Sequence, residues 1–190
     1  MTLRPSGFHG EHPSGDGPRK DRRAPVRFAH HKRTEMDARP TRYRNAVVPH
    51  IYVDGASSGI YFYKQAFGAV ELFRIAHPNG KILHAEISID GSVVMIGDPD
   101  DKLYGEPRKL GRTSASLHIF VDDNEAVLRR AIKAGAEQVQ PPTEMFYGAN
   151  SASLRDPFGH VWVLLTWKED LNPAEMERRG NAFLRQQSSG

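Results

Sequence analysis

The sequence predicts an α+β fold made of two tandem modules, each with the element order β-α-β-β-β. The first observation is a repeat: PHIYVDGA at 49–56 and LHIFVDDN at 117–124 carry a His, an Ile, an aromatic residue, a Val and an Asp in the same order. The second is the spacing: a predicted helix follows each copy and ends at Gly68 or Gly135. The spacing between these two glycines differs by only one residue from the spacing between the two repeated strands. Self-similarity at a fixed spacing indicates duplicated structural units.

The first module opens with a β-branched and aromatic run from Val47 to Val53, which is typical of a strand. The segment SSGIYFYKQAFGA then predicts a helix with a Ser cap at its start and Gly68 at its end. The DG pair at 90–91 lies between alternating apolar residues and indicates a hairpin. The other segments predict three strands, which are VELFRIA, KILHAEISI and SVVMIGD.

The second module repeats this order. ASLHIFV predicts its first strand and NEAVLRRAIKAGAE its helix. QVQPP predicts a short strand, TEMFYGAN a loop, and SASLRDP and HVWVLLTW two strands joined by a type I turn, DPFG. NPAEMERRGNAFLRQ predicts a closing helix with Asn172 as its cap, Pro173 in its first turn and Glu175 at the capping-box position.

Composition sets the boundaries of these parts. Residues 1–44 carry 11 Lys and Arg against 5 Asp and Glu and show no strand or helix periodicity, which predicts a disordered basic arm over 1–45. The arm is interpreted as a solvated tail, as sequence upstream of a true start such as Met36, or as a partner-binding segment; its acidic residues argue against nucleic acid. The other expected parts are a first module at 46–100, a linker at 101–112, a second module at 113–168, and a C-terminal helix and tail at 169–190.

The chain contains no Cys, which excludes disulfides and thiolate metal sites. Its longest apolar runs, VVMI and VWVLL, are far too short to span a bilayer, and no apolar segment of the signal-peptide kind follows the N-terminus. We therefore expect a cytoplasmic protein with no membrane partner.

Several motifs resemble the vicinal oxygen chelate superfamily, which includes glyoxalase I, bleomycin-resistance proteins and extradiol dioxygenases. The resemblance covers about residues 46–180 and is strongest to the PhnB-like branch, through FYKQAFGAVELFRI, GKILHAEISIDGSVVMIGD, SLHIFVDD, FYGANSASLRDPFGHVWVLLT and NPAEMERR. It implies that the two modules form a cupped mixed sheet with a small-molecule ligand in the cup and the helices on the convex face. It also implies a homodimer.

Side-chain alternation along the strands indicates which residues line this cup. In the strand KILHAEISI, the alternation directs Leu83, Ala85 and Ile87 toward the helix. Phe146 and Tyr147, in the predicted loop TEMFYGAN, are interpreted either as a lid over the ligand or as side chains that fill the edge of the core. The predicted ligand-binding residues are His50, Tyr52, His84, Glu86, Ser116, His118 and Phe120 on strands, and Phe146 and Tyr147 on the loop.

The resemblance also implies where a divalent metal would bind in this superfamily. Those ligand positions map onto Val48, Met95, Ser116 and Val163, which are poor ligands, so no metal at the usual site is predicted. Three functional interpretations stay open. The first is a small-molecule-binding protein. The second is a lyase, isomerase or dioxygenase, which uses either a metal-free acid/base pair or a displaced divalent metal (Zn, Ni, Mn or Fe) near His50, Glu86 and His118, with His84 beside them. The third is a partner-binding protein that depends on its basic arm.

Overall fold

The computed structural model of the protein describes residues 40–43, 47–100 and 102–188. The predicted basic arm over 1–45 therefore lies outside the described residues, except for 40–43. None of the helices in the described ranges is both long enough and apolar enough to cross a membrane.

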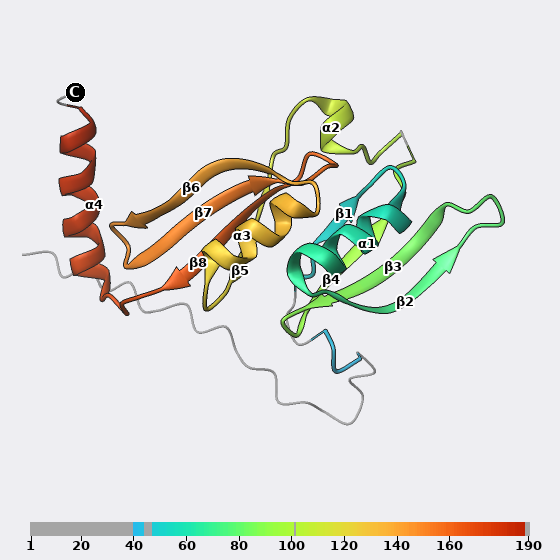
Figure 1. Ribbon diagram of the computed structural model, residues 1–190, viewed down its shortest axis with the longest axis horizontal. Helices are drawn as coiled ribbons and strands as arrows, with labels where there is room; N and C mark the ends of the chain where they lie inside the picture. The colour runs from blue at the N-terminus through green and yellow to red at the C-terminus, as the bar shows by residue number, and fades with distance from the viewer. Residues whose placement is uncertain (1–39, 44–46, 101, 189–190) are drawn as a thin grey trace, which may run out of the picture. The chain divides into compact units, whose positions relative to one another are not determined.

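The first module is a four-stranded mixed sheet with one helix (Figure 1). The strand order is β1-β4-β3-β2, with β1 parallel to β4 and the other pairs antiparallel. Helix α1 contacts β2, β3 and β4; the apolar side chains of β3 and β4 are largely buried, whereas β2 is mostly exposed. The elements are β1 (His50–Tyr52), α1 (Ala56–Phe67), β2 (Val70–Ala76), β3 (Ile82–Ile89) and β4 (Ser92–Gly97).

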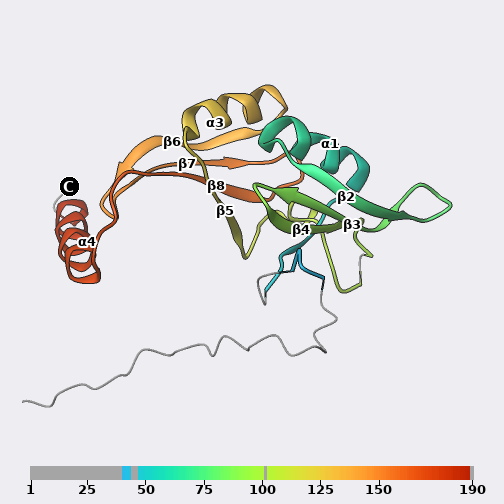
Figure 2. The ribbon, with the colours of Figure 1, turned by 90° about the horizontal axis from the view of Figure 1, so that it is seen from below.

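The second module has the same topology, with the strand order β5-β8-β7-β6 and a parallel β5–β8 pair. Helix α3 contacts β6, β7 and β8, and it also contacts α1; the two helices lie on the same side of the sheets (Figure 2). The predicted fold of two βαβββ modules is confirmed. The elements are β5 (Ser116–Phe120), α3 (Asn124–Lys133), β6 (Glu137–Met145), β7 (Ala149–Arg155) and β8 (Val161–Trp167).

The interface between the modules is built around Trp162, which lies on β8 and is 1% exposed. Its ring packs against Tyr63 and Phe67 of α1, with centroids 5.4 and 4.8 Å away. The Asp156 carboxylate accepts hydrogen bonds from Tyr63 Oη at 2.8 Å and from Trp162 Nε1 at 2.9 Å. His160 Nε2 lies 3.0 Å from the carbonyl oxygen of Tyr52. Polar and aromatic contacts thus join the second module to both α1 and β1.

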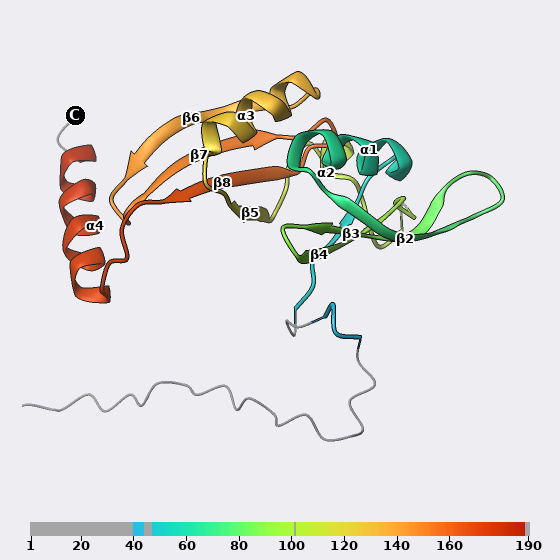
Figure 3. The same ribbon diagram turned by 60° about the horizontal axis from the view of Figure 1, so that its bottom comes forward.

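Two additional helices lie outside the modules. Helix α2 (Pro107–Leu110) is a single turn in the predicted linker. Helix α4 (Pro173–Gln187) follows β8 and lies beside the β6–β7 turn, where Phe146 and Phe183 have ring centroids 5.3 Å apart (Figure 3). The predicted cap of this helix is confirmed, because Asn172 Oδ1 accepts a hydrogen bond from the backbone N–H of Glu175 at 3.0 Å.

Three local predictions were wrong. Strand β6 extends through Met145 where a loop was expected, because register shifts between Gln138 and Thr143 let the strand pass its two prolines and pair again with β7. Leu83 is 70% exposed instead of lying under α1, since a register shift opposite it resets the alternation of β3. The predicted Ser cap of α1 is absent; Asp98 Oδ1 accepts the N–H of Gly55 at 2.9 Å instead.

Candidate functional site

A cavity of about 660 Å³ lies between the β3–β4 hairpin of the first module and strand β5 of the second. Arg42 and Tyr43, which precede β1, form part of its wall. Side chains of different character meet there, as is typical of small-molecule sites. They include the apolar Val48 and Val93, the polar Ser116 and His118, and the aromatic Phe120.

Strand β3 places a carboxylate beside this cavity wall. The Glu86 side chain is only 1% exposed, and its Oε2 accepts a hydrogen bond from Arg42 Nε at 2.6 Å. Its Oε1 accepts a hydrogen bond from the Tyr43 hydroxyl and lies 3.5 Å from His84 Nε2. Burial raises the pKa of Glu86, but the hydrogen bonds from Arg42, Tyr43 and His84 outweigh it and hold the pKa below the ordinary value of 4.5. Glu86 is therefore a charged, fully partnered carboxylate at neutral pH.

We expect the Glu86→Gln substitution to lower the free energy of unfolding at pH 7 by about 2 kcal/mol, because the charge-assisted hydrogen bond from Arg42 is lost. The pKa of this carboxyl is lower in the folded chain than in the unfolded chain. Its stabilisation is therefore complete well above pH 4.5 and is lost as the pH falls below that value. Urea unfolding of both proteins between pH 7 and pH 3 measures the difference, which should shrink as the pH falls.

The matched control for this pH series is Glu125→Gln on α3. Glu125 forms an ion pair with Arg129, at 3.5 Å on the exposed helix surface. Exposed pairs of this kind contribute little to stability. A difference for Glu86→Gln that stays constant from pH 7 to pH 3 would contradict the linkage argument.

His50 belongs to a row of stacked rings. Its ring stacks on Tyr52 with centroids 4.6 Å apart, and Tyr52 stacks on Tyr104 at 4.4 Å. The edge of the His84 ring faces His50 at 5.6 Å. Burial, with a smaller contribution from His84, lowers the pKa of His50 below its ordinary value of 6.5. Sequence reasoning missed Tyr104, because this residue lies in the linker, where strand alternation provides no signal.

His118 lies in different surroundings from His50. Its Nε2 is 3.2 Å from the Ser116 hydroxyl, and both side chains line the cavity. Phe120 is 62% exposed and has Trp167 as its ring neighbour at 6.3 Å. Among the described residues, no hydrogen bond or ring contact joins His118 to the first-module cluster of His50, Tyr52, His84 and Glu86. The repeat therefore places the two histidines at equivalent strand positions but in separate groups.

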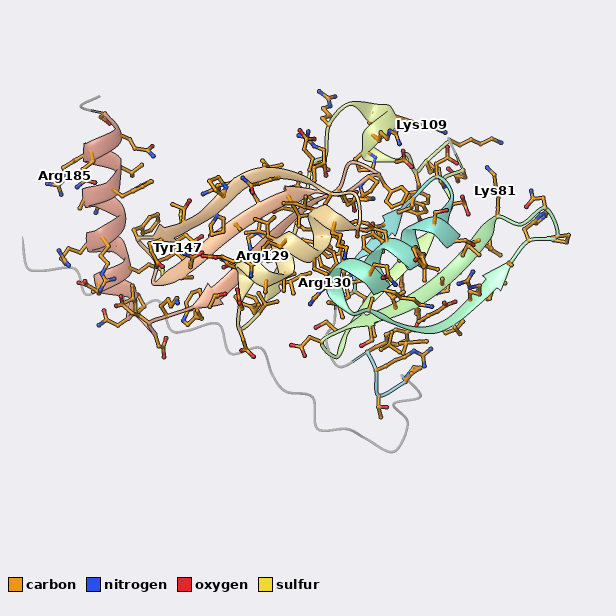
Figure 4. The ribbon with its side chains drawn as sticks, in the orientation of Figure 1. Lys81, Lys109, Arg129, Arg130, Tyr147 and Arg185 are labelled. Carbon is orange, nitrogen blue, oxygen red and sulfur yellow. The ribbon has the colours of Figure 1, made fainter. Side chains whose placement is uncertain are left out.

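The two aromatics at the β6–β7 turn form a third group. Phe146 packs against Phe183 and faces Gly180 of α4, and Tyr147 stacks on Trp167 with centroids 6.4 Å apart. Figure 4 shows Tyr147 at the end of the second sheet that is nearest α4. Neither aromatic lines the cavity between the hairpin and β5. The structure thus places Phe146 against the closing helix and Tyr147 against the end of β8.

The positions implied for metal ligands carry unsuitable side chains. Val48, Met95 and Val163 have no nitrogen or oxygen donor in their side chains, and the hydroxyl of Ser116 is directed to His118. In the part of the chain that the structure describes, no three His, Asp or Glu side chains gather closely enough to hold a metal ion. The residues present do not fit a divalent metal at these positions.

The residues predicted for a displaced metal site have better donor atoms, but their arrangement does not suit a metal ion. His50, His84 and Glu86 lie together, whereas His118 belongs to the separate cavity group. The oxygens of Glu86 already accept hydrogen bonds from Arg42 and Tyr43. A metal bound there would first have to displace both of these donors.

Comparison with known proteins agrees with this architecture. The profile of the Glyoxalase/Bleomycin resistance protein/Dioxygenase superfamily matches residues 45–164, from before β1 to the middle of β8. The chain belongs to this superfamily. The superfamily resemblance noted in the sequence is thereby confirmed, and the fold class with it.

Relatives of this superfamily member come from several sources. Over 136 residues the chain is 38% identical to Rv0887c, an uncharacterized protein of Mycobacterium tuberculosis, which corresponds to 70% of this chain and 80% of the relative. The solved Arabidopsis thaliana gene product At5g48480 shares 26% identity with a TM-score of 0.53, over 64% of this chain and 98% of that one. The PhnB protein from Bacillus cereus shares 16% identity with a TM-score of 0.50, over 64% and 99%, and is similar in fold alone.

Proposed function

We propose that this superfamily member binds a small organic molecule in the cavity between the β3–β4 hairpin and strand β5, without a metal at the superfamily's usual ligand positions. The observation that carries this proposal is the wall of the cavity. Val48 and Ser116, at two of the positions implied for metal ligands, both line this cavity. Their side chains are poor metal ligands but suit contact with an organic molecule. His118 and Phe120 add one polar and one aromatic contact.

A cavity-filling substitution tests this function. Val93 is buried and faces the cavity, so Val93→Trp is expected to occupy part of the 660 Å³ with its indole ring. A library of neutral and charged aromatic compounds is screened against the wild type by thermal shift, and the affinities of the compounds that bind are measured by calorimetry. We expect these affinities to fall at least tenfold in Val93→Trp, because the indole ring and the ligand cannot occupy the same volume.

The matched control is Val139→Trp, which introduces the same side chain at an exposed position on β6. This variant should bind the compounds as the wild type does. Ligands that bind Val93→Trp and Val139→Trp equally well would show that the cavity is not the binding site.

We also propose a homodimer of the PhnB-like branch that works in the cytoplasm. A chain without Cys needs no disulfide and is compatible with the reducing cytoplasm, and motifs such as SLHIFVDD and NPAEMERR support the branch. Support for the dimer comes from large apolar side chains left exposed on the strands of both sheets. They include Val70, Ile75, Leu83, Phe120 and Trp167. Light scattering in solution measures the mass directly, and a monomer would contradict this assembly.

A further inference from the structure

The partner of Glu86 comes from outside the sheet. Arg42 is 44 residues away in the chain, in the segment that precedes β1. Its side chain is 40% exposed, whereas that of Glu86 is 1% exposed. Arg42 can therefore move into solvent while the backbone of the sheet stays in place, but Glu86 cannot. Without Arg42, this buried carboxylate would lose its guanidinium partner and keep only its contacts with Tyr43 and His84, which is a costly change for a buried charge.

Aromatic rings complete the surroundings of the Arg42 guanidinium. Its carbon lies 4.7 Å from the centroid of the Tyr43 ring and 5.6 Å from that of Phe73. The ring of His84 lies next to Phe73, with centroids 5.6 Å apart. A carboxylate surrounded by aromatic rings is a combination that recognises organic cations, because the ring faces and the carboxylate both attract positive charge.

We propose that Glu86, His84 and Phe73 form a binding site for the amidinium, guanidinium or ammonium group of a ligand, and that Arg42 occupies this site when the ligand is absent. This inference rests on the proposed function, because Arg42 and Tyr43 are also part of the cavity wall. A ligand cation that replaces Arg42 keeps Glu86 paired. A neutral or anionic ligand in place of Arg42 would leave the buried carboxylate without the guanidinium that now balances its charge, so the site selects for positive charge.

Occupation by Arg42 weakens the apparent affinity for such a ligand, since only the fraction of molecules with the site vacant can bind it. The probes are benzamidine, an aromatic cation, and benzamide, its neutral analogue, titrated by calorimetry into full-length proteins. We expect Arg42→Ala to bind benzamidine at least tenfold more tightly than the wild type does, with no such gain for benzamide. The double variant Arg42→Ala/Glu86→Gln should lose this gain.

The matched control is Arg129→Ala, which removes an exposed arginine on α3 (Figure 4). Arg129 forms an ion pair with Glu125, which is far from Glu86 in sequence. It should bind benzamidine as the wild type does. The proposal is overturned if Arg42→Ala and the wild type bind benzamidine equally, or if the double variant retains the gain in affinity.

A second measurement needs no variant and covers the case in which Arg42→Ala fails to fold. In the wild type, the Nε–H resonance of Arg42 reports its hydrogen bond to Glu86. Benzamidine should shift this resonance in NMR titrations, whereas benzamide should not, and a resonance that benzamidine leaves unmoved overturns the proposal. If benzamidine fails these tests but other compounds lose affinity in Val93→Trp as expected, only the cation site is contradicted. If no compound loses affinity in Val93→Trp, the proposed function itself is contradicted.

Discussion

Replacing Asp156 with alanine is expected to lower the free energy of unfolding by about 4 kcal/mol. The Asp156 carboxylate is buried and accepts four hydrogen bonds. Two come from the side chains of Tyr63 and Trp162, which are almost completely buried, and two from the backbone N–H groups of Phe158 and His160. Alanine leaves all four donors without this acceptor, and buried donors without a partner are strongly destabilising.

Urea unfolding followed by Trp fluorescence measures this loss, with two matched variants. Tyr63→Phe removes only one of the four donors and should cost about 1 kcal/mol. Asp122→Ala removes an exposed aspartate and should change stability very little. If Asp156→Ala destabilised the protein no more than Asp122→Ala, the carboxylate would not be the acceptor that joins α1 to the second module.

Replacing Gly159 with alanine is expected to lower the free energy of unfolding by about 3 kcal/mol. Gly159 has φ +92°, a conformation that is strained for any residue with a side chain. Its added Cβ would also lie 2.5 Å from the backbone N of Arg108, so α2 would have to move. That movement would break the hydrogen bond from Arg108 N–H to the Phe158 carbonyl, which is 3.0 Å long. Thermal or urea unfolding measures the combined loss.

Gly80→Ala separates the two causes of that loss. Gly80 has a similar φ of +87°, but an added Cβ would meet no atom within 4 Å. Only the backbone strain then applies, and we expect a cost of about 1 kcal/mol. Equal losses for the two variants would show that the close approach of α2 to the turn after β7 contributes nothing to stability.

Local patterns in the sequence predicted most of the secondary structure. The Asn172 cap could be predicted because an N-cap depends only on residues within one turn. Strand β6 and the α1 cap could not. The register shifts that carry β6 past its prolines depend on pairing with β7, and the cap of α1 comes from Asp98 at the end of β4. Leu83 was assigned to the wrong face for the same kind of reason, because the bulge beside it exists only in the pairing of β2 with β3.

The candidate site divides in the same way. Alternation with a period of two identifies the face on which a strand residue lies, but it carries no information about which residue of another element lies opposite. The nine predicted site residues accordingly fall into three groups: one on β1 and β3, one in the cavity beside β5, and one at the β6–β7 turn. The repeat and the strand pattern, which are local properties of the chain, were sufficient for the two modules and for the superfamily. The pairing of Glu86 with Arg42, the separation of His50 from His118 and the position of Tyr104 on Tyr52 depend on contacts between distant segments, and such contacts form only when the whole core packs.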